Sequence, residues 1–216
     1  LELLGIARGV VALTLVDLVD DDHRELARMD VADHVAGTFL DGAEIVEVSS
    51  VTGAGLDRLR AALAELVAAT PGASDRDRPR LWVDRAFAAK GSGTVVTGTL
   101  TGGSLHSDDT LELSPSQRAV RVRALQSLGA QHDRVPPGSR VAINLSGVSH
   151  DEVARGDGLV RAGQWRPTRM FDASLQVLDA LGHPVSRRGA YVVYVGAGEW
   201  PVRLRVELPP TLERRS

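Results

Sequence analysis

The spacing of apolar residues follows two different periods, one before and one after residue 75. In the first part, two apolar runs of strand length, Gly9–Leu15 and Glu44–Val48, alternate with two stretches of helical spacing. The helices are expected at about Asp20–Ala36, where acidic residues favour a helix start, and at Leu56–Val67, where leucine and valine residues recur on one face. Alternation of strands and helices predicts a parallel sheet.

Only two strands are visible in this first part. A parallel sheet of two strands cannot bury both of its faces, because parallel sheets are normally covered by helices on either side. We therefore expect residues 1–75 to be the C-terminal part of a larger α/β domain.

After Pro79 the apolar residues alternate with polar ones, the pattern of half-buried strands. Short runs of this kind are separated by turns rich in glycine, serine and proline, and no helical stretch interrupts them. This pattern predicts a closed β-barrel. The predicted strands of the barrel are Arg80–Ala88, Thr94–Leu100, Thr110–Leu113, Ala119–Leu128 and Arg140–Leu145.

A third region repeats the β-type pattern but is shorter. Its predicted strands are Phe171–Leu178, Gly189–Val195 and Val202–Leu208, too few to close a barrel. The predicted fold class is therefore multidomain, α/β followed by all-β. Its parts are residues 1–75, a complete barrel at residues 79–163, and the first part of a second barrel at residues 166–216.

The segment Thr70–Pro79 is polar, carries alternating charges and has a proline near each end. These features predict a linker between the first two parts. An ordinary surface loop is the alternative interpretation.

Composition excludes several classes of site. The chain has no cysteine, which rules out disulfides, cysteine-bound zinc and a thiol nucleophile. Its apolar runs are shorter than the roughly 20 residues of a membrane span, so no membrane association is expected. The six histidines show no metal-ligand spacing, and no metal site is predicted. Lys90 is the only lysine. The acidic excess lies before residue 79 and a small basic excess after it, a weak signal for nucleic-acid binding.

Polar residues follow both strands of the α/β part. Thr14 and Asp17 come after the first strand, and Ser49, Ser50 and Val51 come after the second. The carboxyl ends of parallel strands meet at one edge, where α/β folds bind ligands. A carboxylate there can accept two N–H bonds from a guanine edge. The alternative is that Asp17 only starts the following helix.

Other candidate features are better explained structurally. Gly91-Ser92-Gly93 is interpreted as a hairpin turn, because no helix follows it as in a phosphate loop. The acidic run at residues 20–22 is interpreted as a helix cap. Trp82, Trp165 and Trp200 are too scattered for a stacking platform and are expected to pack within or between the parts.

Several motifs resemble one family. The Thr-x-x-Asp sequence at residues 14–17, followed by Val48–Gly53, is similar to the last two guanine-binding motifs of translational GTPases. The barrel and the residues after it resemble the second and third domains of elongation factor Tu-like proteins, and among these the bacterial selenocysteine-specific elongation factors. The matching segments are Val83–Phe87, Lys90–Leu100, Gly138–Ala142, Asp151–Asp157, Arg187–Tyr191 and Gly196–Pro201.

The resemblance implies a GTPase that delivers selenocysteinyl-tRNA to the ribosome at recoded UGA codons in the cytoplasm. GTP is the implied cofactor, with Thr14, Asp17 and the Ser49–Val51 loop on the guanine side. The ribosome and selenocysteinyl-tRNA are the implied partners. Family members contact mRNA through a C-terminal region that has no counterpart in this sequence.

The resemblance also implies an aminoacyl pocket lined by Asp84, Arg85 and Arg140. A selenol is largely ionised at neutral pH, so guanidinium groups would favour it over a serine hydroxyl. Asp84 would pair with the aminoacyl ammonium or orient an arginine. The alternative is a surface pair of little energetic value.

The sequence departs from the family at two points. Leu15 stands where the guanine motif has a lysine, which keeps apolar cover over the base but removes a charge. No segment matches the phosphate loop G-x-x-x-x-G-K-[ST], and the switch segments and Mg²⁺ ligands of a GTPase are not found. We therefore expect no catalytic residue in this sequence and no GTP hydrolysis by it alone.

Two alternatives remain at this point. One is a non-catalytic barrel module that binds tRNA or a protein partner. The other is a part of another translational GTPase, such as elongation factor Tu or an initiation factor. The presence of both Arg85 and Arg140 disfavours this second alternative.

Overall fold

The computed structural model describes residues 5–89, 91, 93–175, 177, 185–186 and 189–205. The chain divides into two compact units, Leu1–Gly72 and Ala73–Ser216. The predicted three-part division stays a prediction. No helix of the described residues is long and apolar enough to cross a membrane.

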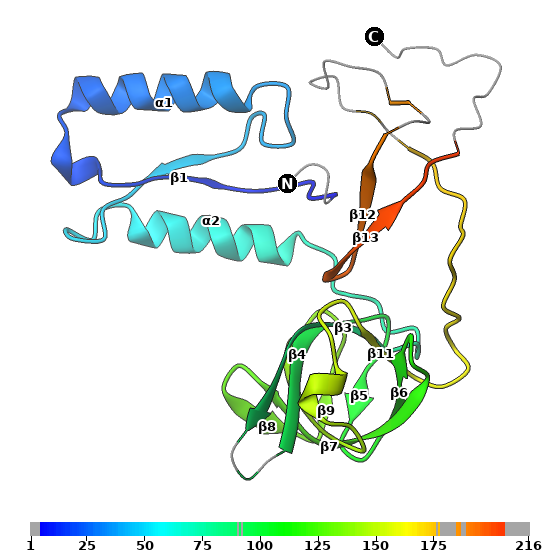
Figure 1. Cartoon of the computed structure of the whole chain (residues 1–216). Coiled ribbons are helices and arrows are strands. Elements are labelled where there is room, and N and C mark those ends of the chain that lie inside the picture. Colours follow the sequence, from blue (N-terminus) through cyan, green and yellow to red (C-terminus); the bar gives the residue numbers. More distant parts are fainter. Residues whose placement is uncertain are drawn as a thin grey trace. The chain divides into compact units, whose positions relative to one another are not determined.

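The first unit contains a parallel pair of strands. Strand β1 (Val11–Leu13) pairs with β2 (Ile45–Glu47), so that Val11 lies opposite Ile45, and this confirms the predicted parallel pairing. Helix α1 (Asp21–Val35) connects the strands, and α2 (Leu56–Ala68) follows β2. Figure 1 shows the two helices on opposite sides of β1.

The starts of both helices have clear local causes. The Asp20 carboxylate accepts a hydrogen bond of 3.0 Å from the backbone N–H of His23, which caps α1 as predicted. Before α2, Gly55 has a φ of +70°. A Cβ atom at this position would overlap the backbone carbonyl of Glu47, so only glycine fits.

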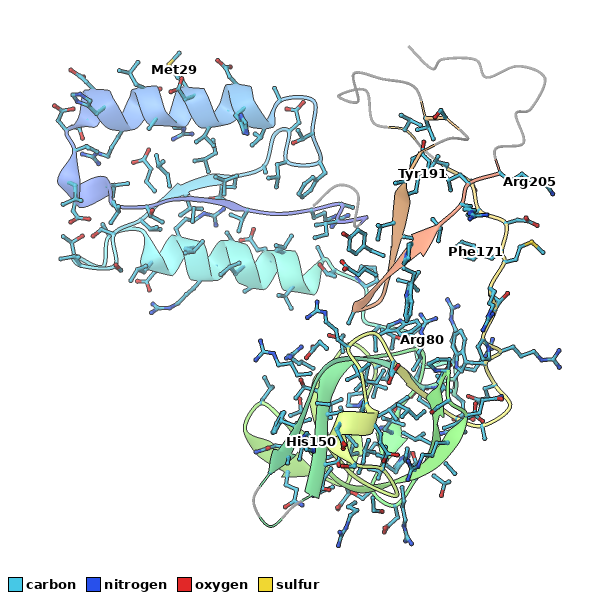
Figure 2. The ribbon with its side chains drawn as sticks, in the orientation of Figure 1. Met29, Arg80, His150, Phe171, Tyr191 and Arg205 are labelled. Atoms are coloured by element: carbon cyan, nitrogen blue, oxygen red, sulfur yellow. The ribbon has the colours of Figure 1, made fainter. Side chains whose placement is uncertain are left out.

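The two helices are buried to different extents. Val46, Val48 and Ala62 form a small core between β2 and α2. Helix α1 has no buried residue, and Leu26 and Met29 are both more than half exposed. Figure 2 shows Met29 on the side of α1 that faces away from the strands.

The second unit contains a closed barrel of antiparallel strands, as predicted. Around the barrel, neighbouring strands follow the order β10–β4–β3–β11–β6–β7, and pairing of β10 with β7 closes the ring. The six strands are β3 (Arg80–Ala89), β4 (Gly93–Thr101), β6 (Thr110–Ser114), β7 (Arg118–Ser127), β10 (Arg140–Ser146) and β11 (Gly158–Val160). Three short strands, β5 (Leu105–His106), β8 (Ala130–His132) and β9 (Arg134–Val135), complete this region.

Alternation of inward and outward residues builds the barrel core. In β10, for example, Val141, Ile143 and Leu145 are buried, while Arg140 points outward. Strand β11 was not predicted. Its three residues lie between β3 and β6 and are all buried, so they show no alternation of apolar and polar residues.

The segment predicted as a linker lies against the barrel in its second half. The backbone N–H groups of Arg76 and Arg78 both donate to the carbonyl of Gly102, each at 3.0 Å. The hydroxyl of the buried Ser104 donates to the Asp75 carboxylate at 2.5 Å, and this bond lowers the pKa of Asp75. Residues 75–79 are therefore part of the barrel unit, and the boundary between the two units, after Gly72, falls within the predicted linker Thr70–Pro79.

The third β region contains one hairpin among its described residues. Strands β12 (Tyr191–Val195) and β13 (Gly198–Val202) pair antiparallel. A strand was predicted at Phe171–Leu178, but residues 171–175 and 177 have no strand partner, and residues 176 and 178 lie outside the described residues. The last strand was predicted at Val202–Leu208, but β13 ends at Val202 and residues 203–205 belong to no strand, while residues 206–208 lie outside the described residues.

Candidate functional site

The structure brings the two polar loops of the α/β unit together. The N–H of Val48 donates to the carbonyl of Leu13 at 2.8 Å, and the N–H of Val16 donates back to the carbonyl of Val48 at 3.5 Å. The loop of Thr14–Asp17 therefore lies beside the loop that begins at Ser49. This is the arrangement that the strand-end pattern predicted.

Ser49 shapes its loop from within. Its side chain is almost fully buried, and its Oγ accepts hydrogen bonds from the backbone N–H groups of Val51 at 3.2 Å and Thr52 at 3.1 Å. Ser50 and Val51 are exposed at the surface of the loop. Ser49 thus holds the loop in position, and the exposed Ser50 and Val51 can face a ligand.

Asp17 lies in a short 3-10 helix at Val16–Leu18 and is exposed. It does not cap α1, because Asp20 does so. Among the described residues, Asp17 has no hydrogen-bonding or ionic partner. Its carboxylate is therefore available to accept N–H groups of a ligand. Thr14 is exposed beside it.

Leu15, which stands in the place of the motif lysine, has a left-handed backbone with φ of +63° and is 56% exposed. A shallow apolar hollow is formed by the end of β1, the 3-10 helix and the first part of α1. It includes Thr14 and Leu15 but not Asp17 or the Ser49 loop, so it is not the predicted guanine site.

On the barrel, Asp84 lies at a bulge in β3. Val83 pairs with Gly98 and Arg85 pairs with Thr97, which leaves Asp84 as the extra residue of β3. The bulge turns the Asp84 side chain toward β4 and β10. There the Asp84 carboxylate accepts a hydrogen bond of 2.6 Å from the Thr97 hydroxyl.

Arg140 of β10 binds the same carboxylate with both of its terminal nitrogens. Nη1 lies 2.6 Å from Oδ2 of Asp84, and Nη2 lies 3.1 Å from Oδ1. The Asp84 side chain is 19% exposed, whereas that of Arg140 is 57% exposed. The fork geometry fixes the guanidinium plane while leaving much of it open to solvent.

The charges around Asp84 favour its ionised form. Hydrogen bonding to Arg140 lowers the pKa of Asp84 most strongly, partial burial acts in the opposite direction, and the Thr97 hydroxyl and the charges of Arg140 and Arg85 lower it further. Of the two roles considered for Asp84, orientation of an arginine is the one that the geometry shows.

Arg85 is exposed on the outer surface of the barrel and forms no ion pair with any described residue. Together, Asp84, Arg85 and Arg140 combine two guanidinium groups with one carboxylate. This surface therefore carries net positive charge, and it can attract an anionic group.

Sequence reasoning missed two polar residues here. Thr97 lies within the matching segment Lys90–Leu100, but its bond to Asp84 depends on the bulge. Asn144 lies on the same outward row of β10 as Arg140, and its Oδ1 is buried without a hydrogen-bond partner among the described residues. The alternation of β10, with Arg140, Ala142 and Asn144 outward, could have pointed to it.

No group of three or more potential metal-ligating side chains occurs among the residues that the structure describes. The guanine-side residues and the barrel residues lie in different units, and each set is considered within its own unit.

Comparison with known proteins identifies the barrel. Residues 93–160 match the family model of elongation factor Tu domain 2. The selenocysteine-specific elongation factor of Desulfomicrobium baculatum is 39% identical over 197 residues, which is 91% of this chain and 31% of that protein. The Escherichia coli (strain K12) protein of the same name is 32% identical over 74% of this chain and 26% of its own length. The Haloarcula marismortui translation initiation factor 2 subunit gamma is 31% identical over 76% of this chain and 44% of that protein.

Solved structures give the same result. A bacterial selenocysteine-specific elongation factor, EF-Sec, has a TM-score of 0.80 at 26% identity and covers 94% of this chain and 34% of its own. The Methanococcus maripaludis elongation factor SelB, in complex with the GTP analogue GppNHp, has a TM-score of 0.66 at 26% identity over 71% of this chain and 34% of its own. Residues 93–160 thus match elongation factor Tu domain 2, and the chain is similar to selenocysteine-specific elongation factors and spans about a third of the length of these relatives.

Proposed function

We propose that this chain is part of a GTP-dependent elongation factor that delivers selenocysteinyl-tRNA to the ribosome at recoded UGA codons. The observation that carries the proposal is the surface formed by Asp84, Arg85 and Arg140. It supplies an oriented guanidinium next to a second one, and it occurs in a homologue of selenocysteine-specific elongation factors.

The chemistry of this surface fits an ionised selenol. A selenolate is an anion, whereas the hydroxyl of a seryl group is neutral. A surface with two arginines and one carboxylate would therefore stabilise the selenolate more than the hydroxyl. Because Asp84 already holds Arg140, little side-chain entropy remains to be lost when the anion binds. Arg85, which has no ion pair among the described residues, would contribute its full charge.

The guanine side of a GTP site fits the α/β unit. The exposed carboxylate of Asp17 can accept two N–H groups of guanine, and the loop held by Ser49 can offer backbone groups to the guanine carbonyl. Thr14 precedes Asp17 by three residues and is exposed. Hydrolysis of GTP would supply free energy for delivery. The groups that bind its phosphates and Mg²⁺ would come from other parts of the intact protein.

The proposal is tested on the protein expressed from its complete gene. In the Arg85→Ala, Arg140→Ala double variant, we expect the preference for selenocysteinyl-tRNA over seryl-tRNA to fall at least tenfold. The measurement is protection of each aminoacyl ester from hydrolysis. Arg121→Ala, which removes an exposed arginine paired with Asp108, is the control. If the double variant keeps its preference, the pocket is assigned wrongly.

A further inference from the structure

Unsatisfied polar atoms gather at one place on the barrel unit. Within the described part of the chain, five buried side-chain nitrogen or oxygen atoms have no hydrogen-bond partner. Three of them, Arg80 Nε, Gln164 Oε1 and Trp165 Nε1, belong to residues where β3 begins and where the chain leaves the barrel after β11. Buried polar groups are normally paired, so such a concentration calls for a ligand.

Two arginines stack on the same tryptophan. The guanidinium carbons of Arg78 and Arg80 each lie 4.5 Å from the centre of the Trp165 ring, and that of Arg80 also lies 5.2 Å from the Trp82 ring. Figure 2 labels Arg80 at the end of the barrel where β3 begins. Stacking uses the faces of a guanidinium and leaves the N–H groups on its edge free to donate.

Backbone and side-chain bonds hold the group together. Arg78 Nη2 donates to the backbone carbonyl of Gln164 at 2.5 Å, and Gln164 Nε2 donates to the backbone carbonyl of Asp77 at 2.9 Å. This second bond fixes the orientation of the Gln164 amide, with its Oε1 as the unpaired acceptor.

The two stacked arginines have no acidic partner among the described residues. The carboxylate of Asp77 accepts a hydrogen bond from Arg161 at 2.6 Å, and that of Asp75 is bound by Ser104. Burial, and then the positive charge of Arg78, lower the pKa of Arg80, and no carboxylate opposes these effects. The site therefore has two cations close together without a counterion.

We propose that Arg78, Arg80, Gln164 and Trp165 form a binding site for a phosphate group, hereafter the arginine–tryptophan site. The N–H groups of Arg80 Nε and Trp165 Nε1 would donate to phosphate oxygens, and the edge of Arg78 would supply further donors. Gln164 Oε1 would accept a hydrogen bond from the O–H of a hydrogen phosphate ion or from a ribose hydroxyl next to an RNA phosphate. A simple carboxylate has no such donor, so phosphate fits this donor and acceptor set better.

The site is separate from the surface formed by Asp84, Arg85 and Arg140 and does not depend on the function proposed for it. The phosphate could be a free ion or one from the backbone of an RNA strand, which offer the same oxygens to the arginines. The experiment distinguishes these two sources.

The test follows the indole N–H signal of Trp165 by ¹H–¹⁵N NMR in the 216-residue chain. The signal is assigned by its loss in Trp165→Phe. Sodium phosphate and a single-stranded RNA oligonucleotide are titrated separately, with sodium chloride at matched ionic strength as the reference. We expect a saturable shift of the Trp165 signal with phosphate or RNA but not with chloride. Saturation by both indicates a general phosphate site, and saturation by RNA alone assigns the phosphate to an RNA strand.

Two pairs of variants separate specific binding from general charge. Gln164→Glu keeps the shape of the side chain but places a negative charge at the site, and it should weaken binding at least tenfold. Gln131→Glu adds the same charge on the exposed strand β8 and should change binding less than twofold. Arg80→Gln should likewise weaken binding at least tenfold, and the exposed Arg123→Gln should have little effect.

Thermal unfolding of each variant shows that it is folded, and the exposed Arg78→Gln provides a second arginine test should Arg80→Gln lower stability. The proposal is overturned if neither phosphate nor RNA gives a saturable shift beyond that of chloride. It is equally overturned if Gln131→Glu and Arg123→Gln weaken binding as much as the variants within the site.

Discussion

Arg140 and Asp84 join two strands that do not pair with each other. Arg140 lies on β10 and Asp84 on β3, and β4 runs between them, so the ion pair crosses an entire strand of the barrel. The Thr97 hydroxyl of that middle strand binds the same carboxylate. Three neighbouring strands are therefore connected on their outer surface through one carboxylate.

Replacement of Asp84 by asparagine should destabilise the barrel. The substitution removes the charge that Arg140 binds while keeping the size of the side chain, and we expect a loss of about 1 kcal/mol in the free energy of unfolding. Urea unfolding followed by fluorescence measures it. Asp108→Asn, which breaks the exposed pair with Arg121, is the control and should cost clearly less. Equal losses in the two variants would show that the Asp84 pair is an ordinary surface contact.

The contribution of Asp84 should depend on pH. Its pKa is lower in the folded protein than in the unfolded chain, where an aspartate titrates near about 3.9. The stabilisation is therefore fully present above that value and is lost as the pH falls through the lower, folded pKa. We expect the difference in unfolding free energy between the native protein and Asp84→Asn to be constant from pH 7 to about 5 and to shrink at lower pH. A difference that grows on acidification would contradict this assignment.

Gly55→Ala should destabilise the first unit severely. The new Cβ would overlap the carbonyl of Glu47 and would also have to adopt a positive φ. We expect a loss of about 3 kcal/mol or more. Gly53→Ala is a matched control, because Gly53 also has a positive φ but has no atom within 4 Å of the new Cβ, so only the backbone cost of about 1 kcal/mol applies. Thermal unfolding monitored by far-ultraviolet circular dichroism compares the two variants, and similar losses would refute the steric argument.

Trypsin should discriminate between two polar segments that look alike in sequence. Arg76 is bonded through its backbone to Gly102, whereas Arg169 is exposed and belongs to no strand. Proteolysis requires local opening of the chain, so the bond after Arg169 should be cut first. Mass spectrometry of the early fragments identifies the site. Early cleavage after Arg76 would contradict the view that these backbone bonds hold residues 75–79 against the barrel.

Asp17→Asn should alter the choice of nucleotide in the protein expressed from its complete gene. An amide offers one donor and one acceptor where the carboxylate offers only acceptors, which suits the xanthine base better than guanine. We expect weaker binding of GTP and stronger binding of xanthosine triphosphate, measured by titration with each nucleotide. Glu25→Gln, an exposed change on α1, controls for the loss of charge. An unchanged preference for GTP would remove Asp17 from the site.

Periodicity made most of the fold predictable. Regular alternation located five of the six barrel strands, and the strand–helix pattern located both helices of the first unit. Strand β11 could not be found in this way, because it is buried on both sides and only three residues long. The docking of Asp75 on Ser104 was equally hidden, because a polar segment with proline looks the same whether or not a neighbouring strand offers it hydrogen bonds.

The sequence was sufficient to select the residues of the candidate sites, but not to predict the hydrogen bonds and ion pairs between them. The motif resemblance selected Asp84, Arg85 and Arg140, yet the bulge that turns Asp84 toward Arg140 leaves no mark in the sequence. Ser49 was selected as a ligand-facing residue, while its hydroxyl is used by the backbone of its own loop. The arginine–tryptophan site was missed because its members are far apart in sequence and meet only where the chain enters and leaves the barrel.

Closure of the ring by pairing of β10 with β7 leaves no open edge among the six strands. Strand pairing and the inward residues carry most of that closure, so outward side chains that connect no neighbouring strands can change without threatening the architecture. A barrel of this kind can acquire or exchange recognition chemistry one outward side chain at a time. The exposed Arg85 is one such side chain, and related barrels can therefore diverge in what they recognise while preserving the same interior.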